Sequence, residues 1–386
     1  MNEKHLDDLV SYLKFPSVST DSHYKENVRD CAEWLSSKID EVGLEASIHE
    51  TPGHPIVIGK NKYSEDKPTV MIYGHYDVQP ADPIDLWDSP PFEPIIKDGK
   101  IYARGSTDNK GQHLAHLLGL GESLSENGDL PVNIIYLVEG EEEIGSPNLE
   151  PFLIENKEDL DCDVIAVSDT GMIGSGMGTF TYGLRGVACM EVKVIGPSKD
   201  LHSGVFGGAV ANPCTAISKM ISSLQGLDGR IKVDGFYDRV KEIEDWEKTA
   251  WAKIQLNENE TLDLTGAPEL FGETGFSDNE RRWSRPTAEV NGIGGGYQGE
   301  GSKTVIASES FVKLSFRLVP DQDPEEILNL VKDHFEQFKP KGVRVEYEMG
   351  HSGKAYLMDP QSAVSYTHLR AHETVLDLVC RLLLEK

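Results

Sequence analysis

The sequence predicts an α/β protein with a layered first domain and a smaller α+β insert. Helical segments alternate with continuous apolar strands up to about Gly183, and the pattern after that residue becomes one of half-exposed strands. The chain has 386 residues, which is more than a single hydrophobic core usually holds. We therefore expect two domains.

The first part of the chain alternates helices with strands, three of which are predicted to be buried apolar runs. Cys31, Leu35 and Ile39 recur at helical spacing in the second helix. The segments 68–74 and 132–138 are continuous apolar runs, which are typical of strands buried on both faces of a sheet. Helices are predicted at 4–14, 26–42 and 110–124, and strands at 45–49, 55–59, 68–74, 132–138 and 164–167.

The pattern after Gly183 predicts strand–helix and strand–helix–strand units, the composition of a small α+β insert. Residues 187–195 alternate polar and apolar side chains as a half-exposed strand does. Helices are predicted at 209–225 and 324–338, and further strands at 311–319 and 344–348. The glycine-rich segment 292–301 lacks the lysine and the strand-then-helix context of a phosphate-binding loop, so we do not expect it to bind phosphate.

The composition excludes several classes of partner. Lys and Arg number 37 against 65 Asp and Glu, which gives a net charge of −28 that repels nucleic-acid backbones and anionic lipid. The N-terminus lacks the apolar core of a signal peptide, and no run of apolar residues is long enough to span a membrane. The five cysteines are scattered and form no CxxC pair. We expect a cytoplasmic protein with reduced thiols, without nucleic-acid or membrane partners.

Four short polar segments each follow an apolar strand. The segments are 74–77, 105–111, 139–146 and 168–170. In open α/β sheets, ligands gather outside the carboxyl ends of the strands. The His, Asp and Glu side chains of these segments are therefore expected to meet at one place.

These residue types favour a divalent metal centre. Imidazole and carboxylate groups are zinc ligands, and a carboxylate that bridges two ions would hold them ~3.5–4 Å apart. Asp77 stands two residues from His75 and can accept its free ring N–H, which would fix the tautomer. Glu142 and Glu143 are adjacent and point in different directions, so one can bind metal while the other takes a proton from a metal-bound water.

Each segment also has a plain structural interpretation. A His-x-Asp at a strand end is often a hydrogen-bonded pair, and a run of Glu such as 139–143 is usually a solvated face. Asp108 can be a turn residue, and Asp169 can be a helix N-cap. The joint pattern favours the metal centre, because four such segments directly after buried strands seldom arise from turns and caps alone.

The pattern resembles that of the zinc aminoacylase and dipeptidase family, which includes the carnosinases, carboxypeptidase G and acetylornithine deacetylase. The matching motifs, in order from about residue 1 to 360, are GHYDVQP at 74–80, GSTDNKG at 105–111, EEIGS at 142–146, SD at 168–169, TYGLRG at 181–186, DLHSG at 200–204 and FRLVP at 316–320. The DVQP and TYGLRG segments are most similar to the carnosinase-like, nonspecific dipeptidase branch.

The resemblance implies a zinc-exopeptidase-like, three-layer αβα catalytic domain with an inserted ferredoxin-like lid and dimerisation domain. The first part of the catalytic domain would span 1–185, the lid 186–350, and the start of the returning catalytic segment 351–363. It implies a homodimer formed through the lid domain.

The resemblance also implies a role for each site residue. His75 and Asp169 would bind the first metal ion, Glu143 the second, and Asp108 both, with a cis peptide bond after Asp108. Glu142 would be the general base, and Asp77 would orient His75. Further roles are implied in the lid: His202 would reach the partner subunit's site and stabilise the oxyanion, Arg317 would clamp the substrate carboxylate, and Asn291 and His351 would line the substrate pocket.

The end of the chain departs from the family pattern. After about 353–356 the catalytic domain should resume and supply a glycine-rich substrate loop and a last His ligand for the second metal ion. Residues 364–386 instead resemble a translated sequencing adaptor, so we expect family sequence to stop near 360–362. We expect the natural full-length protein to be active, and the 386-residue chain to be poorly stable and impaired.

The sequence thus predicts a metal-dependent hydrolase of small amide bonds, and a dipeptidase in particular. Two divalent metal ions would activate a water molecule, with zinc expected and manganese or cobalt also compatible. An N-acyl amino acid deacylase, of the acetylornithine deacetylase or desuccinylase type, is the alternative within the hydrolases. A non-catalytic binding protein on the same fold is the alternative of another class.

Overall fold

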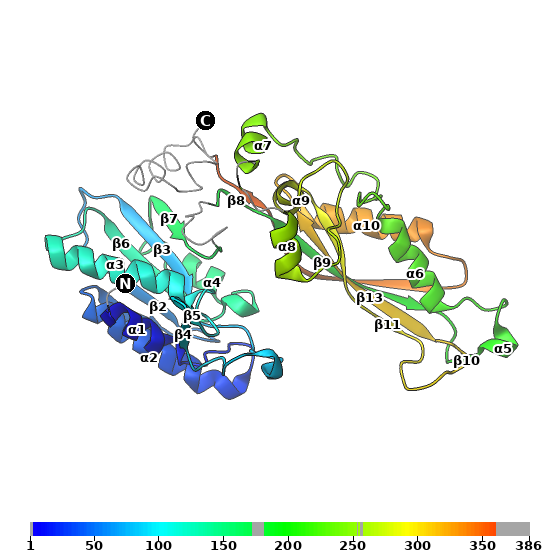
Figure 1. The fold of residues 1–386 in the computed structure, drawn as a ribbon, viewed down its shortest axis with the longest axis horizontal. Coiled ribbons are helices and arrows are strands. Elements are labelled where there is room, and N and C mark those ends of the chain that lie inside the picture. Colours follow the sequence, from blue (N-terminus) through cyan, green and yellow to red (C-terminus); the bar gives the residue numbers. More distant parts are fainter. Residues whose placement is uncertain (1–2, 172–180, 253, 255–257, 360–386) are drawn as a thin grey trace. The chain divides into compact units, whose positions relative to one another are not determined.

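The computed structural model describes residues 3–171, 181–252, 254 and 258–359 (Figure 1). The chain divides into two compact units, Met1–Gly171 and Met172–Lys386, called here the N-terminal and C-terminal units. Each is described by itself. The expectations for residues 360–386 lie outside the described residues.

The N-terminal unit is built on a five-stranded mixed sheet with the order β1-β2-β6-β3-β7. Its strands are β1 (Glu45–His49), β2 (Ile56–Lys60), β3 (Thr69–His75), β6 (Asn133–Glu139) and β7 (Val164–Val167). β3 lies between β6 and β7 and is parallel to both, whereas β1 and β2 are antiparallel to their neighbours. All five predicted strands are present, with ends that differ by at most one residue.

Helices cover both faces of this sheet and give it three layers. Alternate strand residues point to opposite faces: Ile72 and Tyr136 pack with the helices on one face, and Met71 and Ile135 pack with α4 on the other. The helices of the first face are α1 (Glu3–Leu13), α2 (Lys25–Glu41) and α3 (Lys110–Asn127), and the other face carries α4 (Leu149–Glu155). The predicted αβα layering is confirmed.

The C-terminal unit contains a four-stranded antiparallel sheet with the order β11-β13-β9-β14. Its main elements are β9 (Gly186–Ile195), α6 (Pro213–Leu224), β11 (Thr287–Gly295), β13 (Glu309–Leu318), α10 (Pro324–Phe338) and β14 (Arg344–Gly353). This βαββαβ succession with that strand order is the ferredoxin-like arrangement expected from the family resemblance.

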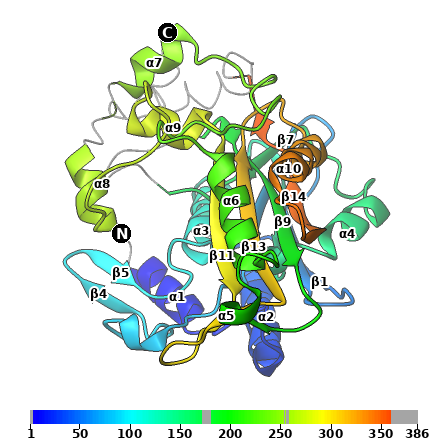
Figure 2. The ribbon, with the colours of Figure 1, turned by 90° about the vertical axis from the view of Figure 1, so that its right-hand side faces the viewer.

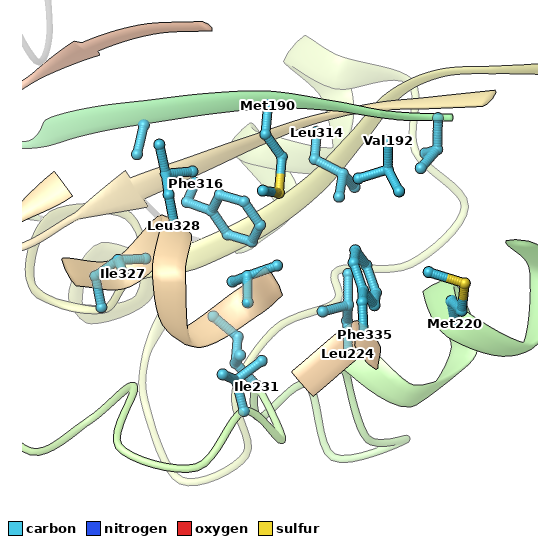
Figure 3. Packing of buried hydrophobic residues seen from close by; sticks show 14 of the residues in the cluster. Met190, Val192, Met220, Leu224, Ile231, Leu314, Phe316, Ile327, Leu328 and Phe335 are labelled. Atoms are coloured by element: carbon cyan, nitrogen blue, oxygen red, sulfur yellow. The ribbon is translucent and has the colours of Figure 1, made fainter. Parts of the chain in front are cut away.

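One face of the C-terminal sheet forms the core of the unit. Along β9, buried and partly exposed residues alternate strictly, as expected for a sheet covered on one side. Figure 2 shows α6 in front of this sheet. Figure 3 shows that Phe316 and Leu314 of β13, Phe335 of α10 and Met220 of α6 belong to one buried cluster.

The remaining elements are short and link the larger ones. In the N-terminal unit they are η1 (Ser22–Tyr24), η2 (Ile84–Leu86), β4 (Ile95–Lys97), β5 (Lys100–Tyr102) and η3 (Glu142–Ile144). In the C-terminal unit they are β8 (Gly183–Leu184), β10 (Leu201–His202), α5 (Ser203–Phe206), α7 (Asp245–Trp251), α8 (Glu258–Thr265), α9 (Asp278–Ser284), β12 (Val305–Ile306) and β15 (Tyr356–Leu357).

One prediction about local structure needs correction, and one strand of the four-stranded sheet was not predicted. The helix expected at 209–225 begins only at Pro213, because the side chain of Asn212 caps its first turn and accepts a hydrogen bond from the backbone N–H of Cys214 at 2.9 Å. The strand that was not predicted is β11, which includes the first residues of the glycine-rich segment 292–301; there Gly294 pairs with Phe311 of β13.

Among the described residues, none of the helices has both the length and the apolar character that crossing a membrane requires. The four described cysteines are free thiols, and the fifth, Cys380, lies outside the described residues.

His113 of α3 is a buried, neutral histidine that links stability to pH. Its ring lies between the hydroxyl groups of Tyr12 and Tyr136, and burial lowers its pKa well below the ordinary value of 6.5. Below about pH 6.5 the unfolded chain therefore binds a proton that the folded protein does not, so stability falls as the pH decreases.

We predict that replacing His113 by Gln makes stability less sensitive to acid. Between pH 6.5 and 5.5, the unfolding free energy of the variant should fall less steeply than that of the wild type, by up to about 1.4 kcal/mol per pH unit. Urea unfolding at both pH values, in the same concentration of chelator, measures the two slopes. Equal slopes would show that His113 does not carry this dependence.

Candidate metal centre

The parallel strands bring three of the four predicted segments to one edge of the sheet. His75 is the last residue of β3 and pairs in register with Glu139, the last residue of β6. Glu142 and Glu143 follow three and four residues later in η3, and Asp169 follows the end of β7. This confirms that the carboxyl ends of the strands gather these side chains.

The fourth segment reaches the site by another route. Asp108 does not follow a strand of this sheet; it comes after the small hairpin of β4 and β5 and stands two residues before the first residue of α3. The expectation that all four segments end strands of one sheet is therefore wrong for this one. The peptide bond between Asp108 and Asn109 is cis, as the family resemblance implied.

The side chain of His75 lies at the centre of the acidic groups. Its Nε2 atom is 3.2 Å from Oδ1 of Asp108, 3.5 Å from Oδ2 of Asp169 and 4.0 Å from Oε2 of Glu142. The imidazole is fully buried, and Nε2 has no hydrogen-bond partner among the described residues. A buried polar atom without a partner, surrounded by carboxylate oxygens, fits the place of a metal ion.

Two overlapping sets of side chains could each hold a cation. One consists of His75, Asp108 and Asp169, and the other of His75, Glu142 and Glu143; within each set the candidate ligand atoms lie within 4.8 Å of one another. The donors are imidazole and carboxylate, and no cysteine is in either set. Such donors suit zinc, manganese or cobalt.

The Glu run at 139–143 is not a solvated face. Glu139 is 1% exposed and accepts hydrogen bonds from the hydroxyl groups of Tyr73 and Ser146 at 2.6 and 2.8 Å. Glu141 is 4% exposed and accepts hydrogen bonds from the backbone N–H of His54 and from Asn148. These two glutamates are structural.

Glu142 and Glu143, in contrast, line an open polar pocket. The pocket has a volume of about 510 Å³ and is lined by Thr107, Asp108, Glu142, Glu143, Asp169, Thr170 and Gly171. Gln79 donates a hydrogen bond to Oε2 of Glu143 at 2.7 Å, which orients that carboxylate. The pocket offers room for a small polar substrate beside the candidate ligands.

Asp77 connects the end of β3 to the start of η3. Its buried carboxylate accepts hydrogen bonds from the backbone N–H groups of Glu142 and Glu143 at 3.2 and 3.1 Å, and from the hydroxyl of Ser19 at 2.7 Å. The Nδ1 atom of His75 is 3.0 Å from the backbone oxygen of Asp77 and 3.4 Å from its carboxylate. Asp77 therefore anchors the Glu pair as well as lying beside the imidazole.

The electrostatics of the site favour a cation at its centre. Burial lowers the pKa of His75, but the nearby carboxylates of Asp108, Asp169 and Asp77 outweigh it and raise that pKa to about 12. Burial raises the pKa of Glu142 to about 7. The acidic groups thus hold a proton on His75 that a divalent cation would have to displace.

The other four predicted residues lie in the C-terminal unit. His202 is exposed in β10, where its Nε2 is 3.2 Å from the hydroxyl oxygen of Thr304, and Arg317 is exposed on β13. Asn291 and His351 are exposed at irregularities in the two edge strands, β11 and β14, where the pairing register shifts. The six metal-centre residues thus come together in the N-terminal unit. The other four are distributed over β10, β11, β13 and β14 of the C-terminal unit.

Sequence reasoning missed two residues of the site, Ser19 and Asn109. Ser19 supports Asp77 from far away in the sequence, and no local pattern marks it. Asn109 lies inside a motif that the sequence analysis quoted, yet a polar residue after Asp108 looks like part of a turn. In the structure it is fully buried, which only the fold reveals.

Comparison with known proteins identifies the family. The sequence profile described as "Peptidase family M20/M25/M40" matches residues 71–375. The chain belongs to this family. Because it is a family of metallopeptidases, membership implies divalent metal ions, in agreement with the donor set around His75.

Individual members are similar along most of the chain. The Cys-Gly metallodipeptidase dug1 of Schizosaccharomyces pombe is 33% identical over 380 residues, which cover 93% of this chain and 79% of that protein. The M20 family metallo-carboxypeptidase Sso-CP2 of Sulfolobus solfataricus is 34% identical, with a TM-score of 0.83 over 97% of this chain and 84% of that one. Human carnosine dipeptidase 1 is 28% identical, with the same TM-score and the same two coverages.

We predict that replacing Asp77 by Asn destabilises the N-terminal unit even without metal. All three groups that bond to the carboxylate are donors, so an amide NH₂ must face at least one of them. An unsatisfied buried donor costs about 1–3 kcal/mol. Urea unfolding in a chelator measures this loss. Replacing Ser19 by Ala, which removes one donor, should cost less; an Asp77→Asn protein as stable as the wild type would contradict the anchoring role.

Proposed function

We propose that this protein is a metal-dependent dipeptidase that hydrolyses the amide bond of a dipeptide. The observation that carries the proposal is the buried, unpartnered Nε2 atom of His75, which faces the carboxylates of Asp108 and Asp169. The similarity to the Cys-Gly metallodipeptidase and to carnosine dipeptidase supports a dipeptide as the substrate class.

We propose that the site holds two divalent ions, and that these are zinc. His75 and Asp169 would bind the first ion, Glu143 the second, and Asp108 both. Two observations support this proposal. The two candidate ligand sets share His75 and differ in their carboxylates, and the donors contain no thiolate.

In this proposal the metal ions supply a Lewis acid and a water molecule of lowered pKa. Glu142 then acts as general base. Its carboxylate lies in the pocket, partly exposed, and burial raises its pKa to about 7, close to the value at which a base works best at neutral pH. The hydrogen bonds that Asp77 accepts from the backbone N–H groups of η3 hold Glu142 in place, and Glu142 would carry the proton to the leaving amine.

We propose that the remaining contacts to substrate come from the C-terminal unit, acting as a lid and dimerisation domain. Arg317 would clamp the substrate carboxylate with its planar guanidinium, and Asn291 and His351 would line the pocket. His202 would act on the partner subunit's site and stabilise the oxyanion. The family resemblance and the exposure of all four side chains support these assignments.

A deacylase that acts on N-acyl amino acids would use the same metal centre. The dipeptidase names among the similar proteins favour the dipeptide. A non-catalytic protein on this fold would have no reason to keep Glu142 in the pocket beside the candidate ligands His75, Asp108, Glu143 and Asp169.

We predict that replacing Glu142 by Gln lowers kcat for Ala-Ala by ~10²–10⁴-fold, because general-base catalysis contributes about that much. The metal content should stay unchanged, and a chelator should abolish the wild-type activity. Hydrolysis is followed with zinc or manganese, on the 386-residue chain and on residues 1–360 joined to the C-terminal segment of a relative. The matched control is Glu150→Gln, an exposed glutamate of α4, which should leave the rate unchanged.

Three results of this assay would change the proposed function or mechanism. Cleavage of an N-acetyl amino acid alone would make the protein a deacylase. Full activity of the Glu142→Gln protein would remove that residue from the mechanism. Absence of bound metal and of hydrolysis in both forms of the chain would favour a binding protein.

We predict that two inactive variants restore each other's activity when their subunits are exchanged. In a mixed dimer of Glu142→Gln and His202→Ala chains, one of the two sites has both residues intact if His202 acts across the interface. Random exchange should therefore restore about a quarter of the wild-type rate. Unmixed variants are the control. A mixture that stays inactive, although sedimentation shows dimers that exchange, would place His202 outside the partner's site.

A further inference from the structure

We propose that Asn109 is a positioning residue whose carboxamide holds Asp169 beside His75 and so sets the metal affinity of the site. The inference rests on the proposed role of His75 and Asp169 as ligands of one metal ion. Asn109 itself is not counted as a ligand: it is fully buried, and its amide oxygen and nitrogen are both used in hydrogen bonds within the protein.

The carboxamide makes three hydrogen bonds, and they join two strands. Its oxygen accepts from the backbone N–H of His75 at 3.3 Å. Its nitrogen donates to the backbone oxygen of Ser168 at 2.7 Å and to Oδ1 of Asp169 at 2.8 Å. One side chain thus ties the end of β3 to the segment after β7.

These hydrogen bonds take the place of the backbone hydrogen bonds that would continue the β3–β7 ladder beyond its end. The β3–β7 ladder stops at the pair Tyr73 and Val167, so His75 and Asp169 are the residues that would form its continuation. The N–H of Tyr76 bonds to β6, through the oxygen of Glu139. Because successive N–H groups along a strand point to opposite sides, the N–H of His75 faces β7, and the carboxamide bridges it to that side.

The hydrogen bond from Asn109 also gives the two carboxylate oxygens of Asp169 different surroundings. Oδ1 is bound by Asn109, whereas Oδ2 lies 3.5 Å from Nε2 of His75. One oxygen is therefore fixed by the protein and the other is directed at the candidate metal position. Supporting hydrogen bonds of this kind orient metal ligands, and their loss typically costs about 10–100-fold in metal affinity.

The fold makes room for this carboxamide. A Cβ atom on Gly74 would lie 2.8 Å from Oδ1 of Asn109 and 2.6 Å from Cβ of His113. Only glycine at this position leaves the space that the side chain of Asn109 occupies. Gly74 therefore gives the side chain of Asn109 the space that it needs.

The experiment measures zinc binding, apart from catalysis, in the full chain. Asn109→Leu keeps the approximate shape and removes every hydrogen bond, and Asn109→Ser is made beside it because its smaller side chain is easier to accommodate. The zinc dissociation constant is measured by competition with a chromogenic chelator, and folding by circular dichroism and urea unfolding. We expect the dissociation constant to rise about 10–100-fold in both variants.

Asn133→Leu is the matched control. Asn133 is also a buried asparagine of this sheet, 2% exposed, and its amide donates to the backbone oxygens of Ser64 and Lys67 at 2.9 and 2.8 Å. It lies at the opposite end of β6 from Glu139, so its loss should lower stability and leave zinc affinity as in the wild type. A general effect of losing a buried amide is thereby separated from an effect on the metal centre.

The variant Asp169→Ala, measured in the same series, separates two kinds of failure. If Asp169→Ala loses zinc while folded Asn109 variants bind it as tightly as the wild type, the inference is overturned and the proposed metal centre stands. If Asp169→Ala binds zinc as tightly as the wild type, the ligand assignment fails and the inference fails with it. Weaker binding in the Asn109 variants, with normal binding in Asn133→Leu, supports the inference.

Discussion

The buried imidazole of His75 is the group on which the rest of the N-terminal unit depends. Three carboxylates face this imidazole, and their negative charges repel one another strongly because the site is partly shielded from water. A cation at this point offsets their repulsion. The fold must therefore hold the acidic groups in place before the cation arrives, and most of the polar contacts behind the site serve this purpose.

Backbone and amide groups provide that support. Asp77 is tied to two N–H groups of η3, Asp169 to the carboxamide of Asn109, and Glu143 to Gln79. Asp169 and Glu143 are thus each held at one carboxylate oxygen by a neutral amide donor, whereas both oxygens of Asp77 accept hydrogen bonds. Such preorganisation suits catalysis, because the ligands need little rearrangement when metal or substrate binds.

Much of this could be predicted from the sequence, and the exceptions have physical causes. The middle residues of β3 and β6 are apolar, so the position of these strands between two layers and the meeting of His75 with the Glu run follow from the pattern alone. The burial of Glu139 and Glu141 could not be predicted, because their partners Tyr73, His54 and Asn148 come from other segments. A local pattern also cannot show that Asp108 reaches the site from the loop between the β4–β5 hairpin and α3, and not from the end of a strand of the main sheet. The start of α6, by contrast, could have been predicted, because Asn212 followed by Pro213 is a typical N-cap sequence; the predicted helix nevertheless began at residue 209.

The two units carry different kinds of constraint. The candidate ligands of the N-terminal unit are held by buried bonds, whereas Arg317, Asn291 and His351 of the C-terminal unit are exposed on a sheet whose other face forms the core. Asn291 and His351 stand where the register of an edge strand shifts, and a bulge redirects a side chain without disturbing the packed face. Residues at such positions can change without cost to the fold. Under the proposed roles, the metal chemistry is built into the packing of one unit, and the residues that would contact the substrate stand on the exposed face and the edge strands of the other.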